Sequence, residues 1–232
     1  MGVVTVKFLK DRQMANRIWY FAGMEAIQFL SYSFIDQCDN PFNKILTVLG
    51  YIHICFQPYV LHRSFHPDDN TYQRFVNKIV GRLCLMGAGM MILRWLLVYV
   101  SGPQMTGPGL CVQTEWLRGE QLCTLTGNIH LGWSIPMVDI TYSPWKPSMS
   151  LHAFLMFAPF FVRGTVEAGL SGVILFLAGP GLSYLLTDNL HEQAAIWCFL
   201  SVAEMIPMYG AAKAIMFVLR KSVRLVGKCV GL

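Results

Sequence analysis

Charge is scarce in this sequence. Asp, Glu, Lys and Arg make up 13% of its 232 residues, against about 25% in a typical soluble domain. Hydrophobic residues make up 54%, and apolar runs recur along the whole length. A surface that faces water on all sides is difficult to build from so few charges, so the composition predicts a single integral membrane domain over residues 1–232.

The sequence also lacks the short motifs that identify common catalytic sites. It contains no Walker loop, no G-x-S-x-G and no C-x-x-C. The string HEQAAIW has Ala195 where the H-E-x-x-H zinc motif needs its second histidine. The sequence therefore gives no confident metal-ligand set, no cofactor and no decision on whether the chain is an enzyme.

The apolar runs divide the chain into seven segments. They cover residues 18–35, 45–62, 83–100, 127–143, 148–162, 169–187 and 194–210. A membrane-spanning helix needs roughly 20 apolar residues, and the fourth segment is short and contains His130, Pro136 and Asp139. We therefore predict an all-α fold, a polytopic transmembrane helix bundle of six to seven spans, in which 127–143 does not fully cross.

The distribution of Lys and Arg favours six spans. The N-terminal stretch and the loop 63–82 carry four basic residues each, whereas loops 34–44 and 101–126 carry one each. The positive-inside rule then places the N-terminus and loop 63–82 on the cytoplasmic side. The C-terminal stretch 211–232 carries five basic residues, and six spans return it to that side, whereas seven do not. Neither number is excluded, and the sequence does not distinguish the plasma membrane from an organelle.

The C-terminal stretch 211–232 is predicted to be a basic amphipathic helix on the membrane surface. At about 100° per residue, its basic side chains occupy one arc and its Val and Leu side chains the other. The basic residues that would contact lipid headgroups are Lys213, Arg220, Lys221, Arg224 and Lys228. Their five charges equal the net charge of +5, so nothing indicates nucleic-acid binding. Packing on another membrane subunit is the alternative.

A stripe of polar side chains lies along the first apolar segment. On a helical wheel, these residues fall within about 60° of Glu25: Gln28, Tyr32, Asp36 and Asp39. A carboxylate near the bilayer centre costs at least about 2.5 kcal/mol, so it needs a polar partner. His53 and Gln57, one turn apart in the next segment, are the predicted partners of Glu25, and His130 and His191 are further candidates for the same cluster.

Two readings of this cluster remain open. It can be a site that binds or processes a small polar molecule or a lipid headgroup, or a structural network that fixes helix packing. In the second reading, Asp36 and Asp39 form a turn before Asn40-Pro41. A non-catalytic accessory subunit of a larger membrane complex is the alternative function, and an ion or proton pathway is a third. The expected partners are the lipid bilayer and other membrane subunits.

The cysteines provide one disulfide candidate. Cys111 and Cys123 bracket a polar loop, and a disulfide between them would close a short loop in an oxidising compartment. In a reducing compartment they would be free thiols.

Several stretches carry a resemblance to a known family. MEAIQFLSYSFIDQCDNPFNKILTVLGYIHICFQPYVLH, CTLTGNIHLGWSIPMVD, MSLHAFLMFAPFFV and NLHEQAAIWCF resemble an uncharacterised family of multi-spanning membrane proteins associated with protists, algae and large DNA viruses. The resemblance covers most of residues 24–200 and implies no activity. A looser likeness is to the alkaline-ceramidase-like seven-span metal hydrolases, which implies roles for Glu25, Ser31 and His191, although Ala195 replaces the second histidine of that family's H-x-x-x-H.

Overall fold

The structure, a computed structural model, describes residues 12–63, 71–101, 116–138, 149–163 and 165–200. Most of these residues are helical. The helices are α2 (Arg12–Ser31), η2 (Tyr32–Phe34), α3 (Pro41–Arg63), α4 (Thr71–Ser101), α5 (Met149–Val162), α6 (Val166–Phe176), the π-turn η5 (Leu177–Gly181) and α7 (Leu182–Leu186). Residues 190–200 form a further helical segment. The predicted tail helix 211–232 lies outside the described residues.

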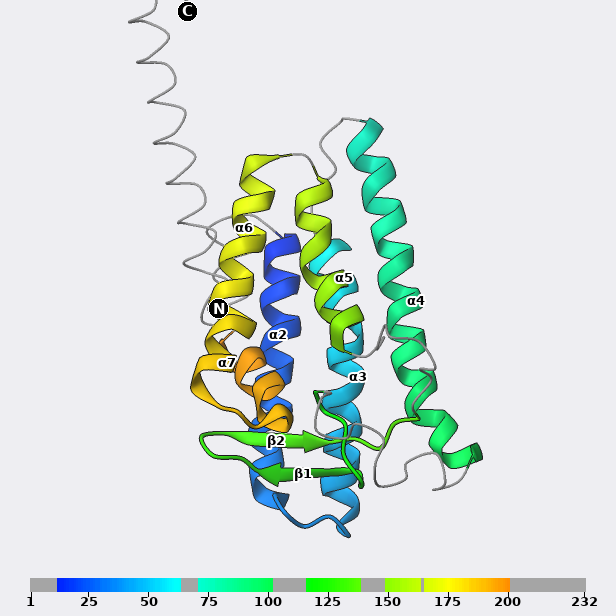
Figure 1. Cartoon of the computed structure of the whole chain (residues 1–232), viewed down its shortest axis with the longest axis vertical. Helices are drawn as coiled ribbons and strands as arrows, with labels where there is room; N and C mark the ends of the chain where they lie inside the picture. The colour runs from blue at the N-terminus through cyan, green and yellow to red at the C-terminus, as the bar shows by residue number, and fades with distance from the viewer. Residues whose placement is uncertain (1–11, 64–70, 102–115, 139–148, 164, 201–232) are drawn as a thin grey trace, which may run out of the picture.

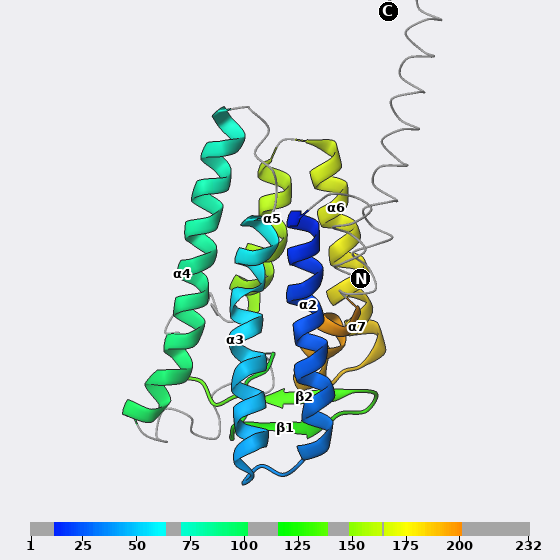
Figure 2. The same ribbon diagram turned by 180° about the vertical axis from the view of Figure 1, so that it is seen from behind.

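The helices run side by side, and a β-hairpin lies across one end of the bundle (Figures 1 and 2). α3 occupies the middle, where it contacts α2, α4 and α5. The hairpin pairs β1 (Cys123–Thr126) with β2 (Leu131–Ser134) in antiparallel register. We call the end with the hairpin and the α2–α3 connection the hairpin end; the last residues of α3 and α5 and the first residues of α4 and α6 lie toward the opposite end.

The hairpin corrects the prediction of an all-α fold. Residues 127–143 were expected to be a short or re-entrant helical segment, but 131–134 form a strand and every residue from 131 to 138 is buried. Two short runs with Thr and Trp flank the turn sequence GNIH, which is the pattern of a hairpin rather than of a helix. The apolar character of this segment reflects burial against the bundle, not contact with lipid.

Three helical segments are long and apolar enough to cross a membrane: α3, α4 and Ala168–Leu186. Large apolar side chains of α4, including Met86, Leu93 and Tyr99, are exposed, as expected of a helix that faces lipid. The described part of the chain is therefore largely helical, with three candidate membrane-spanning helices, and the other described helices are shorter or more polar.

Candidate functional site

Glu192 holds the turn of the hairpin. It lies in the first turn of the helical segment 190–200 and is fully buried. Its Oε2 accepts hydrogen bonds from the backbone N–H of Asn128 (3.0 Å) and the hydroxyl of Thr187 (2.8 Å). Its Oε1 accepts from the backbone N–H of Ile129 (2.6 Å) and of His130. One carboxylate thus binds three consecutive amides of the turn.

Two features suit the turn to this carboxylate. Gly127 leaves room for it, because a Cβ at this position would lie 2.5 Å from Cδ of Glu192. The backbone N–H groups of Asn128, Ile129 and His130 and the hydroxyl of Thr187 all donate to it, and hydrogen bonds to the charged form favour an ionised carboxylate. The positive end of the helix 190–200 also favours a negative charge at this position.

His130 connects the hairpin to α2. Its Nε2 lies 2.8 Å from Oε1 of Gln28, and its Nδ1 lies 2.6 Å from the hydroxyl of Tyr32. Gln28 Nε2 donates to the carbonyl of Ala195 (3.2 Å), which leaves Oε1 of Gln28 to accept from His130. His130 is therefore neutral with the proton on Nε2, and its Nδ1 accepts from Tyr32. Burial lowers the pKa of His130, while the carboxylate of Glu192 opposes that shift.

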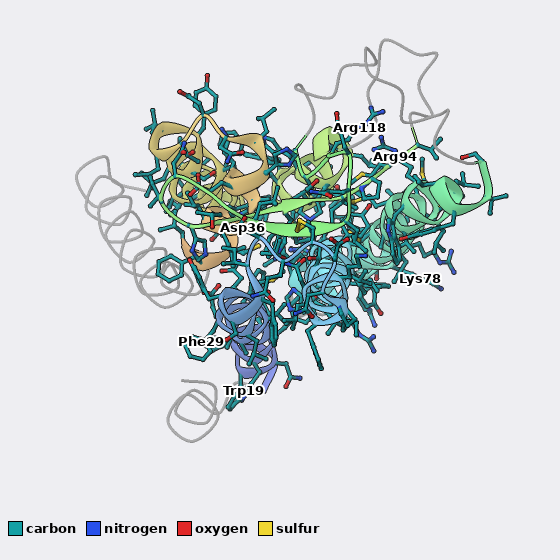
Figure 3. All side chains as sticks on the ribbon, turned by 90° about the horizontal axis from the view of Figure 1, so that it is seen from below. Trp19, Phe29, Asp36, Lys78, Arg94 and Arg118 are labelled. Carbon is teal, nitrogen blue, oxygen red and sulfur yellow. A yellow bond between two sulfur atoms is a disulfide. The ribbon has the colours of Figure 1, made fainter. Side chains whose placement is uncertain are left out.

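Asp36 attaches the α2–α3 connection to strand β1. Its backbone has a positive φ of 62°, and its backbone N–H donates to the carbonyl of Thr124 (3.0 Å). The Asp36 carboxylate accepts from the backbone N–H (2.8 Å) and the hydroxyl (2.6 Å) of Thr126. Figure 3 shows Asp36 beside the hairpin. Asp36 is thus a turn residue that also binds a distant strand.

The first turns of α3 add a second set of bonds to the same strand. The buried side chain of Asn43 exchanges two hydrogen bonds with the backbone of Thr124, at 3.0 and 2.9 Å, and the hydroxyls of Thr47 and Thr124 lie 2.8 Å apart. Sequence reasoning missed Asn43, Thr47 and Thr124 because nothing in the local pattern reveals which distant strand will pack on α3. Thr47 lies in an apolar segment, whereas Asn43 and Thr124 lie in polar stretches, so no shared sequence signal marked the three residues.

The prediction that Cys123 forms a disulfide with Cys111 is wrong. Cys123 is bonded to Cys38 of the α2–α3 connection, 85 residues away in sequence. The hydrogen bonds of Asp36 to Thr124 and Thr126 bring Cys38 to β1, whereas closeness in sequence had favoured Cys111. Cys111 lies outside the described residues.

The other predicted site residues form separate contacts. His53 Nε2 lies 2.8 Å from the carbonyl of Tyr20, and the two rings stack at 3.8 Å. Gln57 donates to the Sγ of Cys198 (3.2 Å). Oε1 of Glu25 is buried and has no hydrogen-bond partner among the residues the structure describes. Glu25 is thus not paired with His53 or Gln57.

His191 supports the hairpin from the same helix as Glu192. Its Nδ1 lies 3.0 Å from the carbonyl of Trp133, and its backbone N–H donates to Oδ1 of Asn189 (3.0 Å). Within the described ranges, no three His, Cys, Asp or Glu residues are placed to hold a metal ion. Of the predicted cluster, the structure therefore gathers Gln28, Tyr32, Asp36, His130 and His191 around the hairpin, where they bind protein groups.

The sequence matches a known protein family. The model of a family of unknown function (DUF5765) matches residues 1–225. The chain belongs to this family. No curated protein and no solved structure matches it. Membership agrees with the expected resemblance to an uncharacterised family, and it brings neither an association with particular organisms nor a relation to the alkaline ceramidases.

Acidification is expected to weaken the hairpin contacts of this DUF5765 member. Burial lowers the pKa of His130 below its ordinary value of 6.5, so neutral His130 stabilises the fold at pH values above 6.5, and that stability is lost as pH falls through the folded pKa. Thermal unfolding measured from pH 7 to 4 should show this decline. His130→Gln should flatten the decline; a curve for the variant that runs parallel to the wild-type curve would contradict the assignment.

Proposed function

We propose that the chain crosses the membrane six times, with the hairpin end on the non-cytoplasmic side. The crossings are α2, α3, α4, α5, the α6–α7 unit and the helix that begins at residue 190. Two observations support this orientation. The Cys38–Cys123 disulfide at the hairpin end suits an oxidising compartment, and Arg63, Lys78 and Arg82 lie in the half of the bundle toward the opposite end, as the positive-inside rule requires.

This topology predicts the accessibility of labels on sealed vesicles. With Cys111 and Cys229 replaced by serine, a membrane-impermeant maleimide should react with Asn128→Cys from the non-cytoplasmic side and with Thr71→Cys only from the other. Both positions are exposed on the protein. Epitope tags at the two termini should be accessible from the side that exposes Thr71→Cys. Tags on opposite sides would require an odd number of crossings.

We infer a non-catalytic role, as a subunit of a larger membrane assembly. The observation that carries this inference is that three side chains expected to line a site bind one another at the hairpin instead: Gln28, Tyr32 and His130 form one chain of hydrogen bonds. Glu192, which was not among the expected site residues, is likewise saturated by the turn. Groups saturated in this way position a structure and are not free to bind a substrate.

The exposed face of α2 is the proposed contact with the partner. α2 is not among the helices apolar enough to be identified as a span, yet Trp19, Phe29 and Leu30 are 56%, 76% and 52% exposed. Figure 3 shows Trp19 and Phe29 pointing away from the bundle. A helix of this composition enters a membrane more favourably beside protein than beside lipid alone.

Site-specific photo-crosslinking tests this proposal. A photoreactive residue at Phe29 should give a discrete heavier protein band in native membranes, whereas one at Leu93 on the lipid-facing side of α4, 51% exposed, should give lipid adducts. Lipid adducts at both positions, with a monomer in mild detergent, would reject the subunit role.

One observation favours a second candidate, a proton or small polar ligand at Glu25. Its buried Oε1 has no hydrogen-bond partner in the part of the chain that the structure describes, and a carboxylate within a membrane bundle commonly marks a transport or ligand site. Glu25→Gln should then slow proton flux into liposomes driven by a pH gradient. If proton flux is equal in liposomes with the wild type, in liposomes with the variant and in protein-free liposomes, the role of Glu25 is rejected and only the subunit role remains.

A further inference from the structure

A groove lies between α3 and α4 near the hairpin. Its volume is about 260 Å³, and it is lined by Lys44, Ile45, Val48, Leu49, Trp95, Tyr99 and Leu122. Small-molecule sites usually measure about 300–1,000 Å³, so this groove is suited to a slender group. Apart from Lys44, its lining is apolar and aromatic.

The groove runs along the two helices. Ile45, Val48 and Leu49 have the spacing of one face of α3, and Trp95 and Tyr99 are one turn apart on α4. α3 and α4 are both membrane-spanning candidates and pack against each other. The groove therefore lies parallel to the spans, in the direction of a lipid acyl chain.

The wall of the groove is built from aromatic rings that pack against one another. Trp95 packs edge-on against Tyr99, with ring centroids 5.9 Å apart, and against Tyr51 at 6.3 Å. Tyr51 is buried and donates a hydrogen bond to the carbonyl of Met91 (2.7 Å). Tyr and Trp are enriched where a span meets the headgroup region, and the proposed six-span topology, on which this inference rests, places this end of the helix pair there.

Lys44 supplies the charge at the mouth. It is exposed and lies in the first turn of α3, at the hairpin end, so its ammonium reaches the level of the lipid phosphates while Ile45 and Leu49 continue toward the membrane interior. We propose that this groove binds an anionic phospholipid, with one acyl chain between α3 and α4 and the phosphate paired with Lys44. The inference is independent of the subunit role proposed for α2.

Native mass spectrometry of the delipidated full chain tests the proposal. Phosphatidylglycerol and phosphatidylcholine with identical acyl chains are the two probes. Because one charge-assisted contact differs, the wild type should bind phosphatidylglycerol about tenfold more tightly. Lys44→Gln should reduce that affinity to the phosphatidylcholine level. Lys78→Gln is the matched control, since Lys78 is an exposed lysine in the first third of α4, toward the opposite end (Figure 1), and it should change nothing.

Variants that fill the groove test whether the acyl chain binds there, independently of the charge of Lys44. Val48→Trp should weaken binding of both lipids, and Ile45→Trp, at a position that is 54% exposed, serves the same purpose if the first variant does not fold. Equal wild-type affinity for the two lipids would overturn the role of Lys44. Unchanged binding by a folded groove-filling variant, or an equal loss in Lys78→Gln, would overturn the groove as the site.

Discussion

Replacing Glu192 by alanine is expected to release the hairpin from the bundle. The change removes the acceptor of three backbone amides and of the Thr187 hydroxyl. Each donor left buried without a partner costs about 1–3 kcal/mol. Since Asn128 and Ile129 lie at an exposed turn that water can reach, we expect a total loss of about 3 kcal/mol in the free energy of unfolding. Reversible unfolding in SDS, followed by tryptophan fluorescence, measures it.

Two variants serve as controls for this result. Asp188→Ala removes an exposed carboxylate from the same connection and should cost less than about 0.5 kcal/mol. Glu192→Gln keeps one acceptor oxygen but turns an NH₂ group toward the amide donors, so it should be intermediate. If Glu192→Ala is no less stable than Asp188→Ala, the carboxylate does not hold the turn.

Removing the Cys38–Cys123 disulfide is expected to cause the largest single loss of stability. The bond joins residues 85 positions apart, and a cross-link of that span stabilises by about 4–5 kcal/mol in the chain-entropy description. Cys38→Ser combined with Cys123→Ser should lower the free energy of unfolding by that order. Dithiothreitol should destabilise the wild type in the same experiment.

The double variant provides the control for reduction. Dithiothreitol should leave its unfolding unchanged, because the bond on which the reductant acts is gone. Peptide mapping of non-reduced protein should recover Cys38 and Cys123 in one cross-linked product. A cross-link of Cys111 to Cys123 would restore the pairing expected from sequence and contradict the structure.

The sequence predicted the helical elements well where the hydrophobic run was long. The runs 45–62 and 83–100 fall within α3 and α4, which are membrane-spanning candidates, and 169–187 corresponds to Ala168–Leu186. The run 127–143 was predicted to be a short or re-entrant segment, but its described part contains strand β2. A helix facing lipid and a strand buried beneath helices are equally apolar, so hydrophobicity could not separate them; the GNIH turn and the Thr residues could have done so.

The sequence located part of the polar cluster but not its pairings. The predicted stripe included Gln28 of α2, Tyr32 of η2 and Asp36 of the α2–α3 connection, which all contact the hairpin. The partners expected in α3 were wrong: His53 contacts Tyr20 and Gln57 contacts Cys198. A helical wheel gives the direction of a side chain within one helix, whereas its partner depends on the rotation and depth of the next.

Composition and periodicity alone indicated helices that can cross a membrane, because a chain with so few charges has little polar surface with which to cover a core. They also located the long apolar helices, since a bilayer core of about 30 Å sets their length. Only the tertiary structure decided that β1 and β2 close one end, that Cys123 bonds to Cys38, and that Glu192 binds the turn. The disulfide and the bonds of Glu192 join residues more than 60 positions apart, and such pairings depend on how the whole bundle packs rather than on any local run of residues.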